Sequence, residues 1–365
     1  MSRVGIARLS PYYVDCEVLT MSVQTVLGPI RREDMGVTTA HEHVFIELTA
    51  FFEERLLRDI PDPATRPVTM NVLGQLARDP YALRDNLRFD DYETQKRELL
   101  HFARAGGRTV VDATTIGIGR DPERLRRMSR ETGLHIVMGA GYYVGSTHSP
   151  EVRASTPEQL AANMVRELNE GMDGTDVRAG IIGEIGVSEV FDESERNVLR
   201  GAAIAQRETG APIHVHINPW TVNGLEAARI LIDAGVSPDR VCIDHIDMEN
   251  RVDYIEKLLD MGCYVEFDNF GKESYIDREA RRPGYSNFNY DTARVELLKH
   301  LIDTGRGDKI LLSCDVCLKT LLRTYGGWGY DHILVNVLPM MDEAGIKASD
   351  IDRLLIDNPA NFFDK

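Results

Sequence analysis

Two histidines two residues apart, His41 and His43, are the first residues of this sequence that could carry chemistry. They lie in residues 38–45, TTAHEHVF, whose apolar flanks favour a β-strand. On a strand this spacing puts both imidazoles on one face, about 7 Å apart, which suits two ligands of one metal centre. The same pattern fits two polar residues on a half-buried strand, so a metal site requires partners elsewhere in the chain.

Further polar residues follow at the ends of other apolar runs. They are Asp112, Glu184, His216, His245, Asp268 and Asp315. A polar residue at a strand end often caps the following helix, and for Asp112 and Asp268 we favour that structural interpretation. The remaining four histidines and two carboxylates favour a functional site, because they end five different apolar runs.

Four imidazoles and two carboxylates are a suitable ligand set for two divalent ions with one bridging carboxylate. Zn²⁺ is expected first, with Mn²⁺ and Co²⁺ as alternatives. Two such ions can share a hydroxide and polarise a scissile C=O or P=O, so the predicted reaction class is hydrolysis. Asp315 is expected to be catalytic, because a carboxylate that ligates a metal and hydrogen-bonds the hydroxide can carry its proton to the leaving group.

The elements that must position these residues alternate regularly. Besides the strand at His41, short β-branched runs predict strands at 109–113, 135–139, 179–185, 212–217, 241–246, 263–268 and 309–314. Helix-period stretches lie between them, near 92–105, 121–133, 157–170, 193–209, 222–235, 250–261 and 291–304. Eight β/α units predict a closed (β/α)₈ TIM barrel, with the active site at the carboxyl ends of the strands. A doubly wound open sheet is the alternative.

Two segments lie outside this alternation. Residues 1–30 are expected to form an N-terminal β-hairpin extension, from the alternating run 17–23 and a second run that ends at 27–29. Residues 31–365 then form a single metal-dependent hydrolase domain. Within it, residues 47–90 are rich in Arg, Asp and Pro and are expected to be an insertion with at most one short helix near 69–78.

Composition narrows the function classes. The chain has 365 residues, of which 43% are hydrophobic and 27% charged, so it can bury a large core. Its net charge of −16 argues against a nucleic-acid partner, and no apolar stretch approaches a membrane span. Five scattered cysteines and the lack of a secretory signal predict a reducing cytoplasm. The single CxxC, Cys314 to Cys317, has no second pair, so a zinc knuckle is not favoured.

Several motifs in order along the chain resemble the phosphotriesterase branch of the amidohydrolase superfamily, and specifically its phosphotriesterase-related members. They are residues 28–30, 40–43, 117–122, 182–186, 212–216, 244–245, 313–315 and 358–359. The resemblance covers nearly the whole chain. It implies a binuclear site with His41, His43 and Asp315 on a buried ion, His216 and His245 on an exposed ion, and a bridging carboxylate from the fourth strand.

Two positions need separate treatment. Both His214 and His216 lie on the fifth predicted strand, and by family position His216 is the ligand, with His214 one layer deeper. Many phosphotriesterases and related lactonases bridge the metals with a carboxylated lysine, but residues 179–189 contain no lysine. Glu184 resembles the bridge of the glutamate-using branch, which needs no carbon dioxide.

The substrate is expected to be a small molecule held by the loops after strands three, seven and eight. Candidate substrate-binding residues are Tyr142, Tyr143, Lys272 and Arg323; a tyrosine could hydrogen-bond a substrate oxygen and the cations an anionic tail. The predicted reaction is hydrolysis of a lactone or other carboxylic ester, with weak phosphotriesterase activity at most. Alternatives are an amidohydrolase for an N-acyl amino acid or similar amide, and a non-catalytic small-molecule binding protein. A homodimer is expected.

Overall fold

The computed structural model describes residues 22–52, 60–276, 281 and 285–364. Eight strands form one parallel sheet in the order β12-β11-β10-β9-β8-β7-β6-β3. β12 lies against β3, and Asp315 N donates to His41 O across this junction at 3.2 Å, so the sheet closes into a barrel. The predicted (β/α)₈ fold is confirmed. The strands are β3 (Thr38–Glu42), β6 (Thr109–Asp112), β7 (His135–Ala140), β8 (Ile181–Gly186), β9 (Ile213–His216), β10 (Val241–Ile243), β11 (Tyr264–Phe267) and β12 (Ile310–Leu312).

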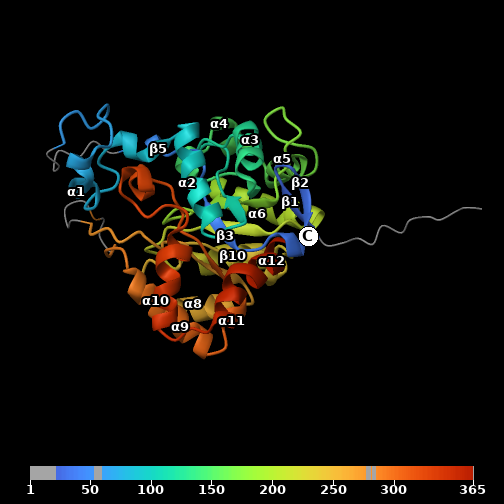
Figure 1. Cartoon of the computed structure of the whole chain (residues 1–365). Helices are drawn as coiled ribbons and strands as arrows, with labels where there is room; N and C mark the ends of the chain where they lie inside the picture. The colour runs from blue at the N-terminus through green and yellow to red at the C-terminus, as the bar shows by residue number, and fades with distance from the viewer. Residues whose placement is uncertain (1–21, 53–59, 277–280, 282–284, 365) are drawn as a thin grey trace, which may run out of the picture.

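The described residues contain seven long helices, which lie around the strands (Figure 1). Side-chain caps begin several of them: Asp91 accepts from Thr94 N at α2, and Asp192 accepts from Glu195 N at α6. Their apolar faces pack on the outside of the strands, which explains the helical period seen between the strands. The helices are α2 (Tyr92–Arg104), α3 (Pro122–Thr132), α5 (Pro157–Asn169), α6 (Glu193–Thr209), α7 (Gly224–Asp233), α8 (Val252–Asp260) and α9 (Asp291–Asp303).

Shorter elements complete the described chain. The segment between β3 and α2 contains α1 and the antiparallel pair β4–β5, and in Figure 1 it lies far from the C-terminal helix α12. The last helices of the chain alternate with π-helical turns at Ile333–Val337 and Arg353–Asp357. The shorter elements are α1 (Leu73–Leu76), α4 (Pro150–Ala154), α10 (Leu338–Glu343), α11 (Ala348–Asp352), α12 (Asn358–Phe363), β4 (Ile46–Glu47) and β5 (Arg88–Phe89).

A hairpin begins the described chain, but both of its strands lie later in the sequence than predicted. β1 (Ser22–Thr25) pairs with β2 (Gly28–Arg31), and the turn is Val26-Leu27. The first predicted strand, 17–23, lies mostly outside the described residues. Gly28 is the first residue of the second strand, whereas the prediction placed it at the end of that strand. Its φ of +115° is a conformation that favours glycine.

The amino end of the barrel is closed by apolar side chains. Val23 of β1 and Phe362 and Phe363 of α12 pack against the inward residues of the strands. Asn358 Nδ2 donates to Gly307 O and Ile310 O, both at 2.8 Å, which attaches α12 to the start of β12. Among the described residues, no helix is both long and apolar enough to cross a membrane.

Candidate metal centre

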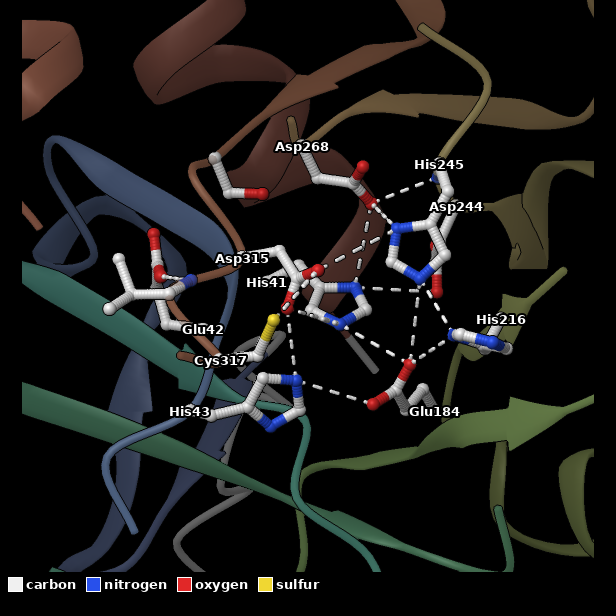
Figure 2. A network of polar contacts seen from close by, with 12 residues as sticks. His41, Glu42, His43, Glu184, His216, Asp244, His245, Asp268, Asp315 and Cys317 are labelled. Atoms are coloured by element: carbon white, nitrogen blue, oxygen red, sulfur yellow. Dashed lines mark hydrogen bonds and ion pairs between the residues drawn. The ribbon is translucent and has the colours of Figure 1, made fainter. Parts of the chain in front are cut away.

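The six expected ligands converge at the carboxyl ends of the strands (Figure 2). His43 Nε2 lies 3.3 Å from Glu184 Oε1 and 3.1 Å from Asp315 Oδ1. His41 Nε2 lies 3.4 Å from Glu184 Oε2 and 4.0 Å from Asp315 Oδ1. His41 belongs to β3, His43 follows it directly, Glu184 belongs to β8 and Asp315 to the loop after β12. His41, His43 and Asp315 form one group of potential ligand atoms.

His216 and His245 form a second group with the same glutamate. His216 Nδ1 lies 3.1 Å from Glu184 Oε2 and 2.7 Å from His245 Nε2. His245 Nε2 lies 3.8 Å from Glu184 Oε2. Glu184 thus lies between the two groups. Its Oε1 faces His43, and its Oε2 faces His41 of the first group and both histidines of the second. A bridging carboxylate requires this position.

Glycines allow the backbone around Glu184 to pack this closely. A Cβ on Gly139 would lie 1.9 Å from Gly183 O, and a Cβ on Gly183 would lie 2.6 Å from His214 O. Gly183 also has φ +133°, which side chains rarely allow. Only glycine fits at both positions, so β7, β8 and β9 approach one another directly beside the carboxylate.

Two of the expected ligands, His245 and Asp315, have left-handed backbone conformations, with φ +58° and +43°. Such conformations are uncommon for residues other than glycine and occur where surrounding contacts enforce them. His245 N donates to Asp268 Oδ2 at 2.9 Å, and Asp315 N donates to His41 O at 3.2 Å. The chain therefore turns sharply as it leaves β10 and β12, at the residues that face the site.

The two aspartates interpreted as helix caps have other roles. Asp112 Oδ2 accepts from Val44 N at 2.8 Å and Oδ1 from Thr114 N at 3.1 Å, so Asp112 fixes the loops after β3 and β6. Asp268 Oδ2 lies 2.9 Å from His245 Nδ1. A carboxylate on the second ring nitrogen orients a metal-binding histidine. The cap interpretation is wrong for both residues.

A fully buried polar layer lies beneath the site. His214 Nδ1 lies 3.0 Å from Asp244 Oδ1 and 3.2 Å from Glu266 Oε2. His41 Nδ1 lies 3.4 Å from Asp244 Oδ2. Asp244 thus faces both His214 and His41, and His214 is one layer deeper than the cavity, where the sequence analysis expected it.

Two divalent ions fit this donor set. Both ring nitrogens of His41 are buried and make no hydrogen bond within the described part of the chain. Burial opposes ionisation of Glu184, but the imidazoles of His41, His216 and His245 outweigh it and hold the pKa of this carboxyl well below its usual range. Buried imidazole nitrogens beside an ionised carboxylate are the ligands that a borderline divalent ion prefers, and its charge would stabilise them.

The second oxygen of Asp315 lies 4.0 Å from His245 Nδ1 and faces a buried lysine. Asp315 Oδ2 contacts the Lys272 ammonium and lies 3.8 Å from Cys317 Sγ. Burial disfavours both charges, but the attraction between them outweighs it: Lys272 holds the pKa of Asp315 below its usual range, and Asp315 raises the pKa of Lys272. The sequence analysis assigned Lys272 to the substrate, whereas the structure pairs it with the predicted catalytic carboxylate.

A cavity of about 720 Å³ opens above the site, and both Tyr143 and Lys272 line it. Tyr143 Oη lies 3.3 Å from each ring nitrogen of His216. Burial raises the pKa of Tyr143, so its hydroxyl stays protonated and can donate to a substrate oxygen. Of the two neighbouring tyrosines, Tyr143 is therefore the one at the site.

The other two candidate substrate residues do not line the cavity. Tyr142 Oη accepts from Asn163 Nδ2 of α5 at 3.2 Å. Arg323 forms a bidentate ion pair with Asp331 at 2.8 and 2.7 Å. Its charge is thus already neutralised within the chain, and we do not assign either residue to substrate binding.

Sequence reasoning missed several cavity residues. Tyr81 and Phe51 come from the segment treated as an insertion, and Trp220 comes from the loop after β9. Tyr81 N donates to Asp79 Oδ1 at 3.3 Å, so a short turn around Pro80 presents the ring. For Tyr81 and Trp220 the only local signal was an aromatic residue after a proline, which does not distinguish a cavity wall from a surface turn.

Comparison with known proteins gives a consistent result. A family model described as Phosphotriesterase family matches residues 21–363. N-acetyltaurine hydrolase from Danio rerio is 40% identical over 346 residues, 92% of this chain and 96% of that protein. A resiniferatoxin-binding protein from Rhodobacter sphaeroides superposes with a TM-score of 0.90 at 34% identity, covering 94% and 95% of the two chains. A lactonase from Listeria monocytogenes superposes with a TM-score of 0.73 at 26% identity, covering 94% and 98%.

Proposed function

The chain belongs to the phosphotriesterase family, and from this premise we propose that it is a two-metal hydrolase that cleaves the amide bond of a small N-acyl compound with an anionic amine part. The sequence analysis put a lactone or other carboxylic ester first and an amide second. We reverse this order because a relative that aligns over 92% of the chain is named an N-acetyltaurine hydrolase. The structure named a lactonase is less similar, at 26% identity.

The proposed ligands form two groups with a carboxylate between them. They are His41, His43 and Asp315 for one ion, His216 and His245 for the other, and Glu184 between the two. Zn²⁺ is the expected metal, with Mn²⁺ and Co²⁺ as alternatives, because imidazole and carboxylate suit all three. When bound, the two ions would supply a nucleophilic water at neutral pH and polarise the scissile carbonyl.

The position of Asp315 carries the proposal. Its Oδ1 lies 3.1 Å from His43 Nε2, and its Oδ2 contacts the Lys272 ammonium. Asp315 can accept the proton that the attacking water loses, while Lys272 holds the carboxylate in place. The same carboxyl then gives the proton to the leaving nitrogen as the C–N bond breaks, so the products are a carboxylate and an amine.

Two further features support an amide with an anionic amine part. An amide nitrogen leaves only when it is protonated, so it depends on a placed proton carrier more than an ester oxygen does. Arg281 lines the cavity and could attract an anionic group of the substrate. The hydroxyl of Tyr143 could donate a hydrogen bond to the carbonyl oxygen of the scissile amide.

Metal analysis and a substrate panel test the proposal together. Protein purified without chelators and reconstituted with Zn²⁺ or Mn²⁺ should contain about two ions per chain. The panel comprises N-acetyltaurine, N-acetyl amino acids, lactones, aryl esters and a phosphotriester. We expect the highest kcat/KM for an N-acyl compound with an acidic group.

Two results would contradict the proposal. Fewer than one ion per chain after reconstitution would rule out the two-metal site. Two ions with lactones preferred over every amide would restore the ester hypothesis. A non-catalytic binding protein is disfavoured, because the chain belongs to a family of hydrolases and five of the six proposed ligands lie in buried groups that could hold a metal ion.

A further inference from the structure

Three aromatic rings form a continuous wall on one side of the cavity. Trp220 stacks on Tyr285 with ring centroids 4.4 Å apart and an interplanar angle of 10°. Phe288 meets Trp220 edge-on at 5.7 Å. Trp220 comes from the loop after β9 and the other two rings from the loop after β11, and all three line the cavity. We call these three residues the aromatic wall.

Hydrogen bonds hold the aromatic wall in place. Trp220 Nε1 donates to Ser286 O at 3.2 Å, and Asn218 Nδ2 donates to Tyr285 Oη at 2.6 Å. Arg251 donates to Trp220 O at 2.9 Å. Because the rings are ordered before a ligand arrives, binding against them costs little additional side-chain entropy.

The position of the proton carrier decides which part of the substrate meets this wall. Asp315 must lie next to the leaving nitrogen, so the amine part points to the β12 side, toward Lys272. The acyl part then points away from it, toward His216 and the loop after β9. Trp220 lies four residues after His216 in that loop. Tyr285 and Phe288 extend from the loop after β11 to contact it, so the aromatic wall is on the acyl side.

Charge supports the same orientation. Glu189 lines the cavity on the acyl side, and its Oε2 accepts from Tyr285 Oη at 3.3 Å. A carboxylate there disfavours an anionic acyl group. Val190 lines the same side with 81% of its surface exposed, as does the buried Val187. Apolar side chains thus face the space where the acyl group would extend.

We propose that the substrate carries a large apolar acyl group, an alkyl chain or aryl ring that lies on Trp220. This inference rests on the proposed amide hydrolysis. An acetyl group would leave most of the aromatic wall in contact with water. A cavity of about 720 Å³ is in the size range of sites that enclose drug-sized ligands, which are much larger than an acetyl group.

An acyl series on one amine tests the inference. The substrates are N-acetyl-, N-butanoyl-, N-octanoyl- and N-phenylacetyltaurine. Full burial of each methylene corresponds to about four-fold in affinity, so even partial burial predicts that kcat/KM rises at least about 30-fold from acetyl to octanoyl. A flat or falling series with measurable amide hydrolysis would overturn the inference and leave the proposed function standing.

Variants in one loop locate the effect. Trp220→Ala should lower the octanoyl-to-acetyl ratio of kcat/KM at least about ten-fold. Val222→Ala is the matched control, because Val222 belongs to the same loop, is exposed and does not line the cavity. It should leave the ratio unchanged. An unchanged ratio in Trp220→Ala would overturn the assignment of the acyl group to this wall.

A binding measurement separates the inference from the proposed function. The chain has two tryptophans, so Trp328→Phe leaves Trp220 as the sole reporter of tryptophan fluorescence. Titration with octanoate should change this fluorescence with saturation, whereas acetate at equal concentration should not. Octanoate binding without hydrolysis of any amide would support the acyl site and refute the proposed function. No response to octanoate would overturn the acyl site.

Discussion

The two ends of the barrel are built in opposite ways. At the amino end, Val23, Tyr264 and Phe362 close the interior with apolar contacts, and Phe362 meets Tyr264 at a centroid distance of 4.8 Å. At the carboxyl end, the interior side chains are histidines and carboxylates, and His245 and Asp315 have left-handed backbones. The amino end is thus a close-packed apolar core, whereas the carboxyl end buries polar groups and uncommon backbone conformations.

The two ends of the same eight strands therefore contribute differently to the free energy of folding. Buried charges such as Glu184 cost desolvation free energy, and left-handed residues cost conformational energy. Burial of large aromatic side chains at the other end offsets such costs. The barrel can therefore maintain an unfavourable ligand cluster because the opposite end of the same strands is tightly packed.

The largest expected effect is on turnover at the carboxyl end. Asp315→Asn should lower kcat by about 10² to 10⁴, since an amide cannot accept the proton of the attacking water. Circular dichroism should show an unchanged fold. Asp308→Asn is the control, because Asp308 precedes the amino end of the same strand and is exposed. A loss of less than ten-fold in Asp315→Asn would contradict the proton-carrier role.

The amino end should show the reverse pattern. Phe362→Ala should lower the free energy of unfolding by about 3 to 5 kcal/mol, because it removes a fully buried aromatic ring. Since His214 and Asp244 separate this ring from His41, kcat per folded molecule should stay within about three-fold. Urea unfolding and activity measure the two quantities, with the exposed Val335→Ala as a control. A large loss of kcat at full folding would mean that the two ends are coupled.

Glu184→Gln should lower metal content and turnover together. The substitution keeps the shape of the side chain but removes the charge that faces both histidine groups, so at least one ion per chain should be lost. Turnover should fall by on the order of 10² or more. Glu189→Gln, five residues further along the chain, should retain both ions. An active two-metal Glu184→Gln protein would place the bridge elsewhere.

The strands, and the gathering of polar side chains at their carboxyl ends, could be predicted from the sequence because they follow regular rules. Parallel strands buried on both faces give short apolar runs, and the run predicted at 212–217 is observed as Ile213–His216. Because strand ends meet at one rim, polar residues such as His245 were expected to gather there. His41 and Asp315 are 274 positions apart in the sequence, yet this rule alone places them on the same rim.

The remaining features depend on contacts that no local pattern encodes. Arg323 was expected at the substrate, but it pairs with Asp331. Trp220 was not singled out, because its position depends on a stack with Tyr285 from another loop. Phe362 of α12 closes the barrel although nothing in its own segment predicts that contact. Loop side chains are therefore determined by tertiary partners rather than by periodicity.

For bicarbonate we expect no effect on metal content or activity. Relatives that bridge their metals with a carboxylated lysine need carbon dioxide to form the bridge, whereas Glu184 carries its carboxylate in the sequence. Residues 179–189 contain no lysine, and Lys272, which lines the cavity, is paired with Asp315. Metal-free protein should therefore regain the same metal content and activity in degassed, bicarbonate-free buffer as in bicarbonate.

The variant Glu184→Lys should show the bicarbonate dependence that the wild-type chain lacks. The variant places an amine where the carboxylate was, so reconstitution should lose its ions in degassed buffer and recover them at least partly in bicarbonate, as metal analysis would show. The wild-type chain, measured in parallel, should respond to neither condition. A bicarbonate requirement in the wild type would mean that a lysine supplies the bridge. Equal metal binding by Glu184→Lys in both buffers would mean that the ions do not depend on a carboxylate at this position.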